Sequence, residues 1–316
     1  MVAATWVITS ALLVAAIGNI ADLFEEREYR YTGGKYHEKF FRYRLFVPRL
    51  LKSTERYPLL VWLHGYGERG TDNQKNLRWL ELVLDDPRHI ERYRFFILAT
   101  QSSDGYWCCG AVASADDMLT ITDTIFRKTM GEYPVDRDRV YLSGVSGGGS
   151  ACWEMAMRYP EVFAAVVPMG SGGGNVSQAA KLVNIPIWAF HNLNDREARP
   201  DRVKRMVAAV KKAGGNVHLT LLEGKWRESS EAWSEWWWSH DCWSEAFHRY
   251  DIVAWMLAQR RGTWICWNPP GGRSWRWWHV LMVPSVLLLA AVWLGWRWER
   301  GRRGRKRLHG VVPRKL

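Results

Sequence analysis

Residues 140–149 read V-Y-L-S-G-V-S-G-G-G, an apolar strand pattern that runs into a G-x-S-x-G sequence with Ser146 at its centre. A helical pattern follows over residues 148–158. When a strand turns sharply into a helix at such a serine, the flanking glycines let the two elements pack closely. The hydroxyl then projects above the sheet, near the positive end of the helix. The stretch therefore predicts that Ser146 is an activated nucleophile, with a plain glycine-rich loop as the alternative.

The chain around this motif alternates short apolar strand patterns with helical patterns. Residues 22–262 form about one domain's worth of chain. Strands are expected at 41–47, 59–63, 95–100, 140–143, 164–169, 187–190 and 217–222, and helices at 73–84, 115–130, 148–158, 202–213 and 252–259. This alternation predicts an α/β fold, in which a mostly parallel central sheet is flanked by helices on both faces.

An activated serine needs a base, and the base needs an acid that orients it. On a sheet of this kind the chain order is serine, then acid, then histidine. Asp195 follows the strand pattern at 187–190, so it lies at the carboxyl end of a strand, where such sheets place their sites. His240 follows the last strand pattern. We therefore expect Ser146, Asp195 and His240 to form a catalytic triad.

Other residues compete for the two supporting roles. Asp195 could instead form an Asx turn or cap a helix. Asp201 is the rival acid, although it follows a proline and resembles a first-turn helix residue. His248 is the rival base, but it lies nearer the next helical pattern and is expected at the surface. His279 and His309 are excluded because they fall in an expected membrane span and in a basic tail.

A tetrahedral intermediate needs two backbone N–H groups directed at its oxyanion. Gly147, directly after the serine, supplies one of them. The second should come from the loop after the strand at 59–63, which reads H-G-Y-G-E-R-G over residues 64–70. Tyr66 is the expected donor. His64 is expected to fix this loop rather than to act as a second catalytic base.

Four stretches of the chain together resemble one family. They are Y-R-L-F-V-P at 43–48, P-L-L-V-W-L-H-G-Y-G-E-R-G-T-D-N at 58–73, R-V-Y-L-S-G-V-S-G-G-G at 139–149 and M-R-Y-P-E-V-F-A-A-V-V-P-M-G-S-G-G at 157–173. Over about residues 41–261 the chain resembles the bacterial α/β-hydrolase group labelled phospholipase/carboxylesterase, also called polyhydroxybutyrate-depolymerase-like or prolyl-oligopeptidase-like. The resemblance implies the α/β-hydrolase fold and hydrolysis of carboxylic esters through an acyl-enzyme intermediate, without a metal or cofactor.

The family's functional residues fall on the positions already singled out. Its triad serine falls on Ser146 and its acid on Asp195. Its histidine, usually in a G-H-D-x-W-like context, falls on His240, where Asp241 and Trp243 also match. A serine peptidase of the same fold remains an alternative function. A membrane-tethered, non-catalytic carbohydrate-binding protein is another, although the intact Ser-Asp-His order favours an enzyme.

The chain departs from the family pattern in two places. The family's H-G-x-x-D motif before the acid reads H-N-L-N-D over residues 191–195, so Asn192 replaces a glycine, a change that bears on the position of the acid's loop. About a dozen extra residues also precede His240, in a Trp-rich insertion at about 225–239. The insertion could be a lid or an aromatic platform for a sugar, an aryl ester or the membrane surface. The alternative is a peripheral loop that packs its own tryptophans.

Apolar segments near both ends predict membrane targeting. Residues 1–21 are expected to be a signal peptide or N-terminal anchor, with a buried helix as the alternative. Residues 277–296 carry no formal charge, have tryptophans at both ends and are long enough to span a bilayer, so a transmembrane helix is expected, with a core helix as the alternative. A linker at 263–276 precedes it. The basic tail at 297–316 predicts a cytoplasmic C-terminus and an exported (periplasmic or extracellular) catalytic domain at 22–262.

The overall charge does not indicate a nucleic-acid partner. Of the formal net charge of +12, residues 297–316 supply +8, because they contain nine Lys or Arg and one Glu. The five cysteines form no C-x-x-C pair, which gives a structural zinc site little support, and their odd number rules out complete internal pairing. No nucleic-acid partner is expected. The family resemblance implies a small or polymeric ester substrate, and the apolar segment at 277–296 predicts the membrane as the other partner.

Overall fold

The computed structural model describes residues 19–84, 94–103, 105, 107, 114–224 and 239–263. The chain divides into two compact units, Met1–Pro269 and Pro270–Leu316, and all described residues belong to the first. Several expected segments lie outside the described residues: residues 1–18 of the N-terminal segment, most of the Trp-rich insertion, nearly all of the linker, the expected span at 277–296 and the basic tail. Within the described part, no helix combines the length and apolar character needed to cross a membrane.

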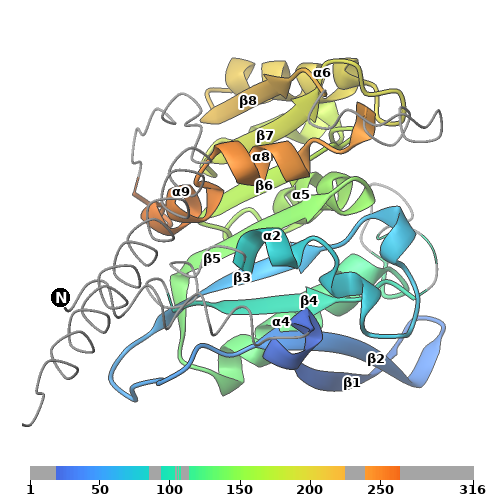
Figure 1. The fold of residues 1–316 in the computed structure, drawn as a ribbon, viewed down its shortest axis with the longest axis vertical. Helices are drawn as coiled ribbons and strands as arrows, with labels where there is room; N and C mark the ends of the chain where they lie inside the picture. Colours follow the sequence, from blue (N-terminus) through green and yellow to red (C-terminus); the bar gives the residue numbers. More distant parts are fainter. Residues whose placement is uncertain are drawn as a thin grey trace, which may run out of the picture. The chain divides into compact units, whose positions relative to one another are not determined.

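The described residues form an eight-stranded sheet in the order β1-β2-β4-β3-β5-β6-β7-β8 (Figure 1). Neighbours from β4 to β8 pair in parallel, whereas β1 pairs with β2, and β2 with β4, in antiparallel. The strands are β1 Glu25–Gly33, β2 Tyr36–Phe46, β3 Tyr57–Leu63, β4 Phe96–Thr100, β5 Val135–Val145, β6 Ala165–Met169, β7 Ile187–Asn192 and β8 Val217–Leu222. All seven expected strands are present, in a mostly parallel sheet as predicted.

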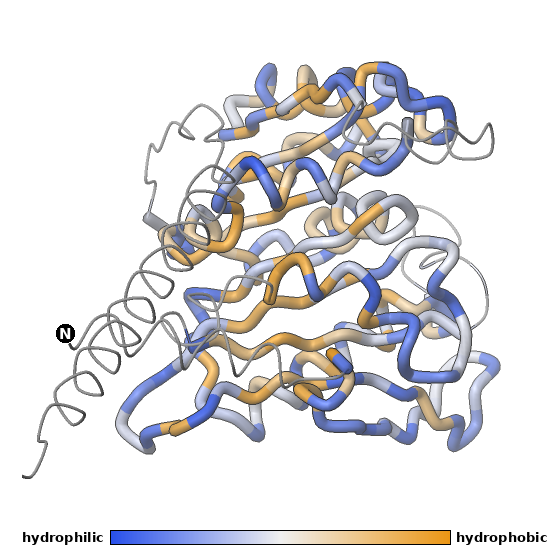
Figure 2. The backbone as a smooth tube through the Cα atoms, in the orientation of Figure 1, coloured by the Kyte–Doolittle hydropathy of each residue, from blue (hydrophilic) through white to orange (hydrophobic). Residues whose placement is uncertain are grey.

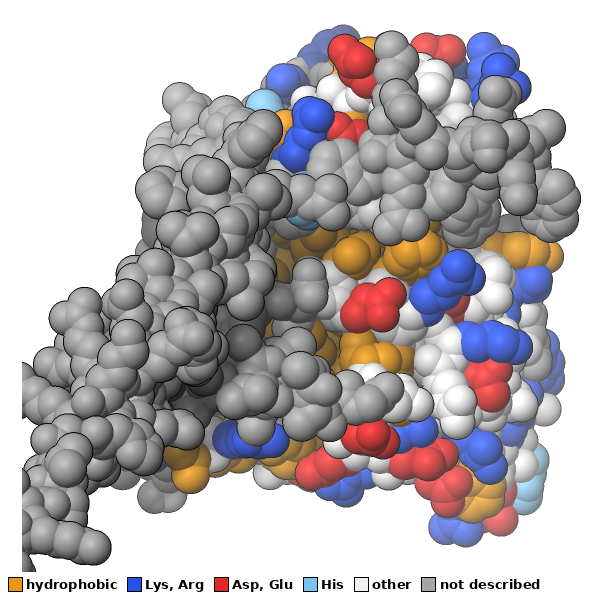
Figure 3. Space-filling view, viewed as in Figure 1, with side chains coloured by type: hydrophobic (Ala, Val, Ile, Leu, Met, Phe, Trp, Pro, Cys, Tyr) orange, Lys and Arg blue, Asp and Glu red, His pale blue; other side chains and the backbone are white. Residues whose placement is uncertain are grey.

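Strand β1 was not expected from the sequence. Its residues E-E-R-E-Y-R-Y-T-G are largely charged and mostly exposed, because β1 is the edge strand of the sheet. Charged side chains are common on edge strands, where they discourage pairing with another chain. Figure 3 shows such side chains gathered over the β1–β2 edge. A hydrophobic pattern therefore could not reveal this strand.

Helices cover both faces of the sheet. Helices α4, α5 and α6 pack on one face, and α2, α8 and α9 on the other, the nearer face in Figure 1. Their bounds are α2 Leu80–Leu84, α4 Met118–Glu132, α5 Gly147–Arg158, α6 Pro200–Lys212, α8 Trp243–Arg249 and α9 Ile252–Ala258. The prediction of one continuous helix at 73–84 was wrong. The segment forms a 3₁₀ turn, η3 Lys75–Leu77, and then α2, because the left-handed backbone of Trp79 (φ +71°) interrupts the helix.

The core is two-sided because side chains alternate along each strand. In β3, Leu59, Val61 and Leu63 pack towards α4 and α5, whereas Leu60 and Trp62 pack on the opposite face. Every residue of β3 is buried, as expected for a central strand of a parallel sheet. Figure 2 shows the apolar character of the central strands against the hydrophilic loops and edge. The sheet thus gives a rigid base for the loops at its ends.

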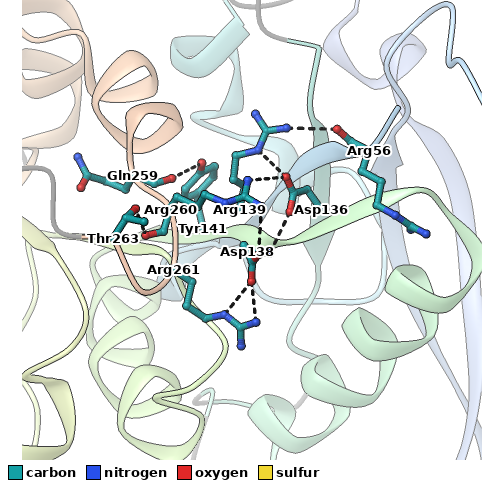
Figure 4. Close-up of polar contacts among 9 residues, drawn as sticks. All are labelled: Arg56, Asp136, Asp138, Arg139, Tyr141, Gln259, Arg260, Arg261 and Thr263. Carbon is teal, nitrogen blue, oxygen red and sulfur yellow. Dashed lines mark hydrogen bonds and ion pairs between the residues drawn. The ribbon is translucent and has the colours of Figure 1, made fainter. Parts of the chain in front are cut away.

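The last described residues are tied to the amino end of β5 by a polar cluster (Figure 4). Arg260 forms ion pairs with Asp136 at 3.0 Å and with Asp138 at 3.1 Å, and Arg261 pairs with Asp138 at 2.7 Å. Exposed pairs of this kind contribute little singly, and a shared network contributes more. Because Ser146 follows the carboxyl end of β5, this cluster and the serine lie at opposite ends of that strand.

Candidate active site

Ser146 occupies the sharp turn between β5 and α5. Its backbone has φ +53° and ψ −116°, a conformation that costs a residue with a side chain roughly 1–3 kcal/mol. The turn is held by a hydrogen bond from the Ser146 N–H to the carbonyl of Met169, at the end of β6, at 2.9 Å. The sharp turn expected at Ser146 is therefore present and its backbone is strained, and the serine is partly exposed.

The glycines of the motif are required by close packing against neighbouring strands. A Cβ added at Gly144 would lie 2.5 Å from the carbonyl oxygen of Leu63, and one at Gly148 would lie 2.0 Å from the same oxygen. A Cβ at Gly149 would lie 2.4 Å from the oxygen of Met169. Such distances are too short for real atoms, so only glycine lets α5 start this close to the ends of β3 and β6.

The structure brings the three expected triad residues together. The Nε2 atom of His240 lies 2.8 Å from the Ser146 hydroxyl oxygen, and its Nδ1 atom lies 2.9 Å from Oδ2 of Asp195. Both His240 and Asp195 are buried. Because an ionised carboxylate can only accept, Nδ1 of His240 carries a proton in this pair. In the neutral ring, Nε2 is then free to accept the proton of the serine hydroxyl.

The carboxylate of Asp195 is stabilised by several donors. Its Oδ1 atom accepts the backbone N–H groups of Glu197 and Ala198, both at 2.9 Å. Its Oδ2 atom faces His240 and also His191, whose Nε2 lies 3.2 Å away. Burial alone would raise the pKa of Asp195, but the hydrogen bonds from His191 and His240 hold it at about 2. Asp195 is therefore ionised at neutral pH.

The rival candidates lie elsewhere. Asp201 is exposed in the first turn of α6, where its carboxylate lies 3.5 Å from Arg199. His248 lies in the last turn of α8. His279 and His309 fall outside the described residues. Of the competing acids and bases that the structure describes, His240 is thus the one that contacts Ser146, and Asp195 is the one that contacts His240.

The two expected oxyanion donors are also adjacent. Gly147 is the first residue of α5, so its N–H has no carbonyl partner within the helix. A Cβ placed on Gly147 would lie 3.4 Å from the backbone nitrogen of Tyr66, which begins the 3₁₀ turn η2 Tyr66–Glu68. The two backbone segments therefore lie beside each other, next to the serine.

His64 fixes the orientation of the Tyr66 peptide. The Ser102 N–H donates to Nε2 of His64 at 2.9 Å, so the proton of the neutral ring is on Nδ1, which donates to the Gly65 carbonyl at 2.7 Å. In a planar trans peptide the N–H points away from the carbonyl, so holding the Gly65 carbonyl also sets the Tyr66 N–H. Burial lowers the pKa of His64 to about 4, which keeps the ring neutral at physiological pH. His64 thus fixes the loop, as expected.

In the part of the chain that is described, the candidate site consists of hydrogen-bonded side chains and backbone groups. That part holds no cluster of three or more His, Cys, Asp and Glu side chains able to bind a metal ion. Of the five cysteines, Cys152 and Cys242 are buried free thiols, and the other three lie outside the described residues. Burial raises the pKa of both thiols, so neither is activated as a nucleophile.

Comparison with known proteins places this arrangement in a family. The family model described as esterase PHB depolymerase matches residues 41–213, more than half of the chain. The chain belongs to this family. The match begins in β2 and covers the serine motif and the loop of Asp195, but it ends before His240. This confirms the resemblance to α/β-hydrolases of the carboxylesterase and prolyl-oligopeptidase type.

Similar individual proteins include esterases and peptidases. A bifunctional acetylxylan esterase/xylanase of Neocallimastix patriciarum is 28% identical over 141 residues, which are 44% of this chain and 19% of that protein. The crystal structure of a thermostable esterase is 30% identical with a TM-score of 0.66, over 77% of this chain and 64% of that one. An acylaminoacyl peptidase is 15% identical with a TM-score of 0.53, over 82% and 44% of the two chains. The peptidase shares the fold alone, and this chain spans less than two thirds of each of these proteins.

Proposed function

We propose that this protein is a serine esterase that hydrolyses carboxylic esters through an acyl-enzyme intermediate. The observation that carries the proposal is the continuous chain of hydrogen bonds from the Ser146 hydroxyl through His240 to Asp195. Family membership supports it, because the matched family is one of esterases. The strained turn that presents the serine gives independent support.

In this mechanism His240 acts first as a general base. As the Ser146 oxygen attacks the ester carbonyl, Nε2 of His240 takes the hydroxyl proton, and a C–O bond forms. Asp195 keeps the ring in the required tautomer and stabilises its positive charge. The tetrahedral intermediate then collapses: the bond between the carbonyl carbon and the alcohol oxygen breaks as His240 gives its proton to that oxygen, and the alcohol leaves. In the second half of the reaction a water molecule gives a proton to His240 and attacks the acyl carbon. The bond from that carbon to the Ser146 oxygen then breaks, His240 returns the proton to this oxygen, and the carboxylic acid leaves.

The negative charge of each tetrahedral intermediate would be stabilised by backbone N–H groups. We assign this role to Gly147 and Tyr66, whose backbones lie side by side next to the serine. The N–H of Gly147 is also at the positive end of α5, which favours a developing oxyanion. Loss of one such donor typically reduces kcat by about 10²–10³-fold.

A serine-reactive fluorophosphonate probe tests the proposal directly. We expect the protein to be labelled and to hydrolyse short-chain aryl esters, and Ser146→Ala to abolish both while the fold is retained. Ser150→Ala is a matched control, because Ser150 lies four residues further along α5 and its hydroxyl accepts the Gly172 N–H at 3.1 Å. Labelling that persists in a folded Ser146→Ala protein would refute the assignment. Peptide substrates measured in the same assays separate an esterase from a peptidase.

We also propose that the catalytic domain is exported and attached to the membrane through residues 277–296, with residues 297–316 in the cytoplasm. Support comes from the sequence, in which a charge-free, Trp-flanked stretch is followed by a basic tail. Protease added to spheroplasts that produce the chain should digest the catalytic domain and spare a tag placed after Leu316. Protection of the domain and loss of the tag would show the opposite orientation.

A further inference from the structure

Asn192 connects the loop of the expected acid to the loop of the expected base. It is the last residue of β7, and its side chain is fully buried. Its Nδ2 atom donates a hydrogen bond to the backbone carbonyl of Ser239 at 3.0 Å, across 47 positions of sequence. Ser239 directly precedes His240. The contact therefore joins the strand that leads to Asp195 to the peptide group that carries His240.

The hydrogen bond from Asn192 has no counterpart in the family motif that this chain resembles. Asn192 stands where the H-G-x-x-D motif has glycine, which has no side chain to donate. The neighbouring strand end makes room for the larger residue. Gly224, two residues after β8, has φ +68°, and a Cβ there would lie 3.2 Å from Cγ of Asn192 and 2.2 Å from Oδ1 of Asn194. A Cβ at position 224 would thus overlap the Asn194 side chain and lie close against that of Asn192.

The segment after His240 has its own attachments. The Cys242 N–H donates to the His240 carbonyl at 2.9 Å, and the Cys242 thiol donates to the Phe190 carbonyl of β7 at 3.4 Å. The ring of Trp243 packs edge-on against the imidazole, with centroids 5.3 Å apart. On the side before His240, the described segment starts at Ser239, and the Trp-rich insertion precedes it in the sequence. Asn192 holds the base loop on that side.

We propose that Asn192 is a positioning residue, which holds the Ser239 carbonyl so that His240 stays within hydrogen-bonding distance of both Ser146 and Asp195. The inference rests on the proposed function of this triad. Because a peptide group is planar, fixing the Ser239 carbonyl also fixes the N–H of His240 and limits the movement of its Cα. A misplacement of about 1 Å at a reacting group can reduce the rate by about 10²-fold.

The test compares three variants at neighbouring positions. Asn192→Leu keeps the approximate size of the side chain but removes the donor, and Asn192→Gly introduces the residue of the family motif. Asn194→Asp is the control, because Asn194 is exposed two residues further along the same loop. We expect both Asn192 variants to lower kcat by about 10–100-fold with KM almost unchanged, and to slow fluorophosphonate labelling by a similar factor. Asn194→Asp should keep the parent kcat and labelling rate.

A second measurement separates positioning from stability alone. The proton between His240 and Asp195 should give a low-field NMR resonance, assigned by its disappearance in His240→Ala, and this resonance should shift or broaden in both Asn192 variants. Variants with a lower Tm but an unchanged resonance, kcat and labelling rate would overturn the proposal and leave Asn192 a purely structural residue. The resonance reports on Asn192 even in a protein that hydrolyses none of the esters tested. Absence of labelling in the parent would instead refute the esterase proposal.

Discussion

Replacement of Gly148 by alanine should damage the oxyanion hole while adding only one methyl group. Gly148 is the second residue of α5, and a Cβ there would lie 2.0 Å from the Leu63 oxygen and 2.5 Å from the His64 oxygen. Both are backbone atoms, so no flexible side chain can move aside. To restore a contact of 3.0 Å, α5 and the end of β3 must separate by about 1 Å. This separation would move Gly147 away from Tyr66, and the backbone N–H groups of these two residues are the proposed oxyanion donors.

Two opposing contributions decide the effect on stability. Alanine favours a helix over glycine by at most about 1 kcal/mol, and by less in the first turn. Overpacking of a close contact costs typically about 1–3 kcal/mol. The steric cost prevails, and each kcal/mol lowers the Tm of a domain of this size by roughly 2–4 °C. Loss of one oxyanion donor lowers kcat by about 10²–10³-fold, so the effect on activity should be much larger than the effect on folding.

Steady-state hydrolysis of an aryl ester, together with thermal unfolding followed by circular dichroism, measures both effects. Gly67→Ala is the matched control, because Gly67 lies in the same oxyanion loop and an added Cβ there has no atom within 4 Å. We expect Gly148→Ala to retain the fold, to lose kcat with little change in KM, and to melt at a lower temperature, whereas Gly67→Ala resembles the parent. A Gly148→Ala protein with the parent kcat and Tm would show that the start of α5 is not packed tightly against the carbonyls of Leu63 and His64.

Three further predictions concern the acid, the base and the loop. Asp195→Asn should reduce kcat by about 10⁴-fold at neutral pH, as the equivalent change does in serine proteases, and a loss below tenfold would argue against its role. His240→Ala should lose about 10²–10⁴-fold in kcat and His248→Ala little, and the reverse ranking would move the base to His248. The pKa of His64 is about 4 in the folded protein and about 6.5 in the unfolded chain. As the pH falls, the His64 ring is therefore protonated in the unfolded chain before it is protonated in the folded protein. Its contribution to the free energy of unfolding, up to about 3 kcal/mol, is present above pH 6.5 and lost towards pH 4, and urea unfolding of His64→Gln should lack this loss.

The sequence predicts most of the sheet because its central strands are buried on both faces. Such strands must be continuous apolar runs, as in β3 and β6, and a run of that kind can be recognised without any knowledge of its neighbours. The edge strand β1 escaped because it is mostly exposed. The short helix α8 escaped because its seven residues, W-S-E-A-F-H-R, are mostly polar, whereas the equally short α9, which was expected, is almost wholly apolar. The segment at 73–84 misled because its apolar pattern continues through the left-handed residue Trp79.

The candidate site likewise contains residues that the sequence can predict and residues whose roles only the fold reveals. Ser146 and Gly147 are predictable because the strand, the turn and the helix that position them are consecutive in the sequence. The roles of His191 and Asn192 depend on contacts across the fold. His191 contributes a second imidazole to Asp195, and its spacing of four residues from the acid was visible, but its orientation was not. The hydrogen bond from Asn192 to Ser239 spans 47 positions, and no local pattern could indicate it.

The geometry of the site follows from the way in which successive strand ends are connected. The Ser146 N–H donates to the Met169 carbonyl of β6, the Gly170 N–H to the Phe190 carbonyl of β7, and the Leu193 N–H to the Leu222 carbonyl of β8. These backbone bonds carry the regular spacing of the sheet into the loops that hold the serine and the acid.

His240 lies outside this series, because it follows β8 by a long stretch of chain and belongs to no strand. Side chains contribute to its position: Asp195 contacts one ring nitrogen, Trp243 packs against the ring and Asn192 bonds to the preceding peptide. We therefore expect His240, the proposed base, to be the member of the proposed triad whose placement is most sensitive to single substitutions outside the triad. The chain can also accept an insertion just before His240, provided that a contact such as the hydrogen bond from Asn192 to Ser239 fixes the point where the chain returns to the site.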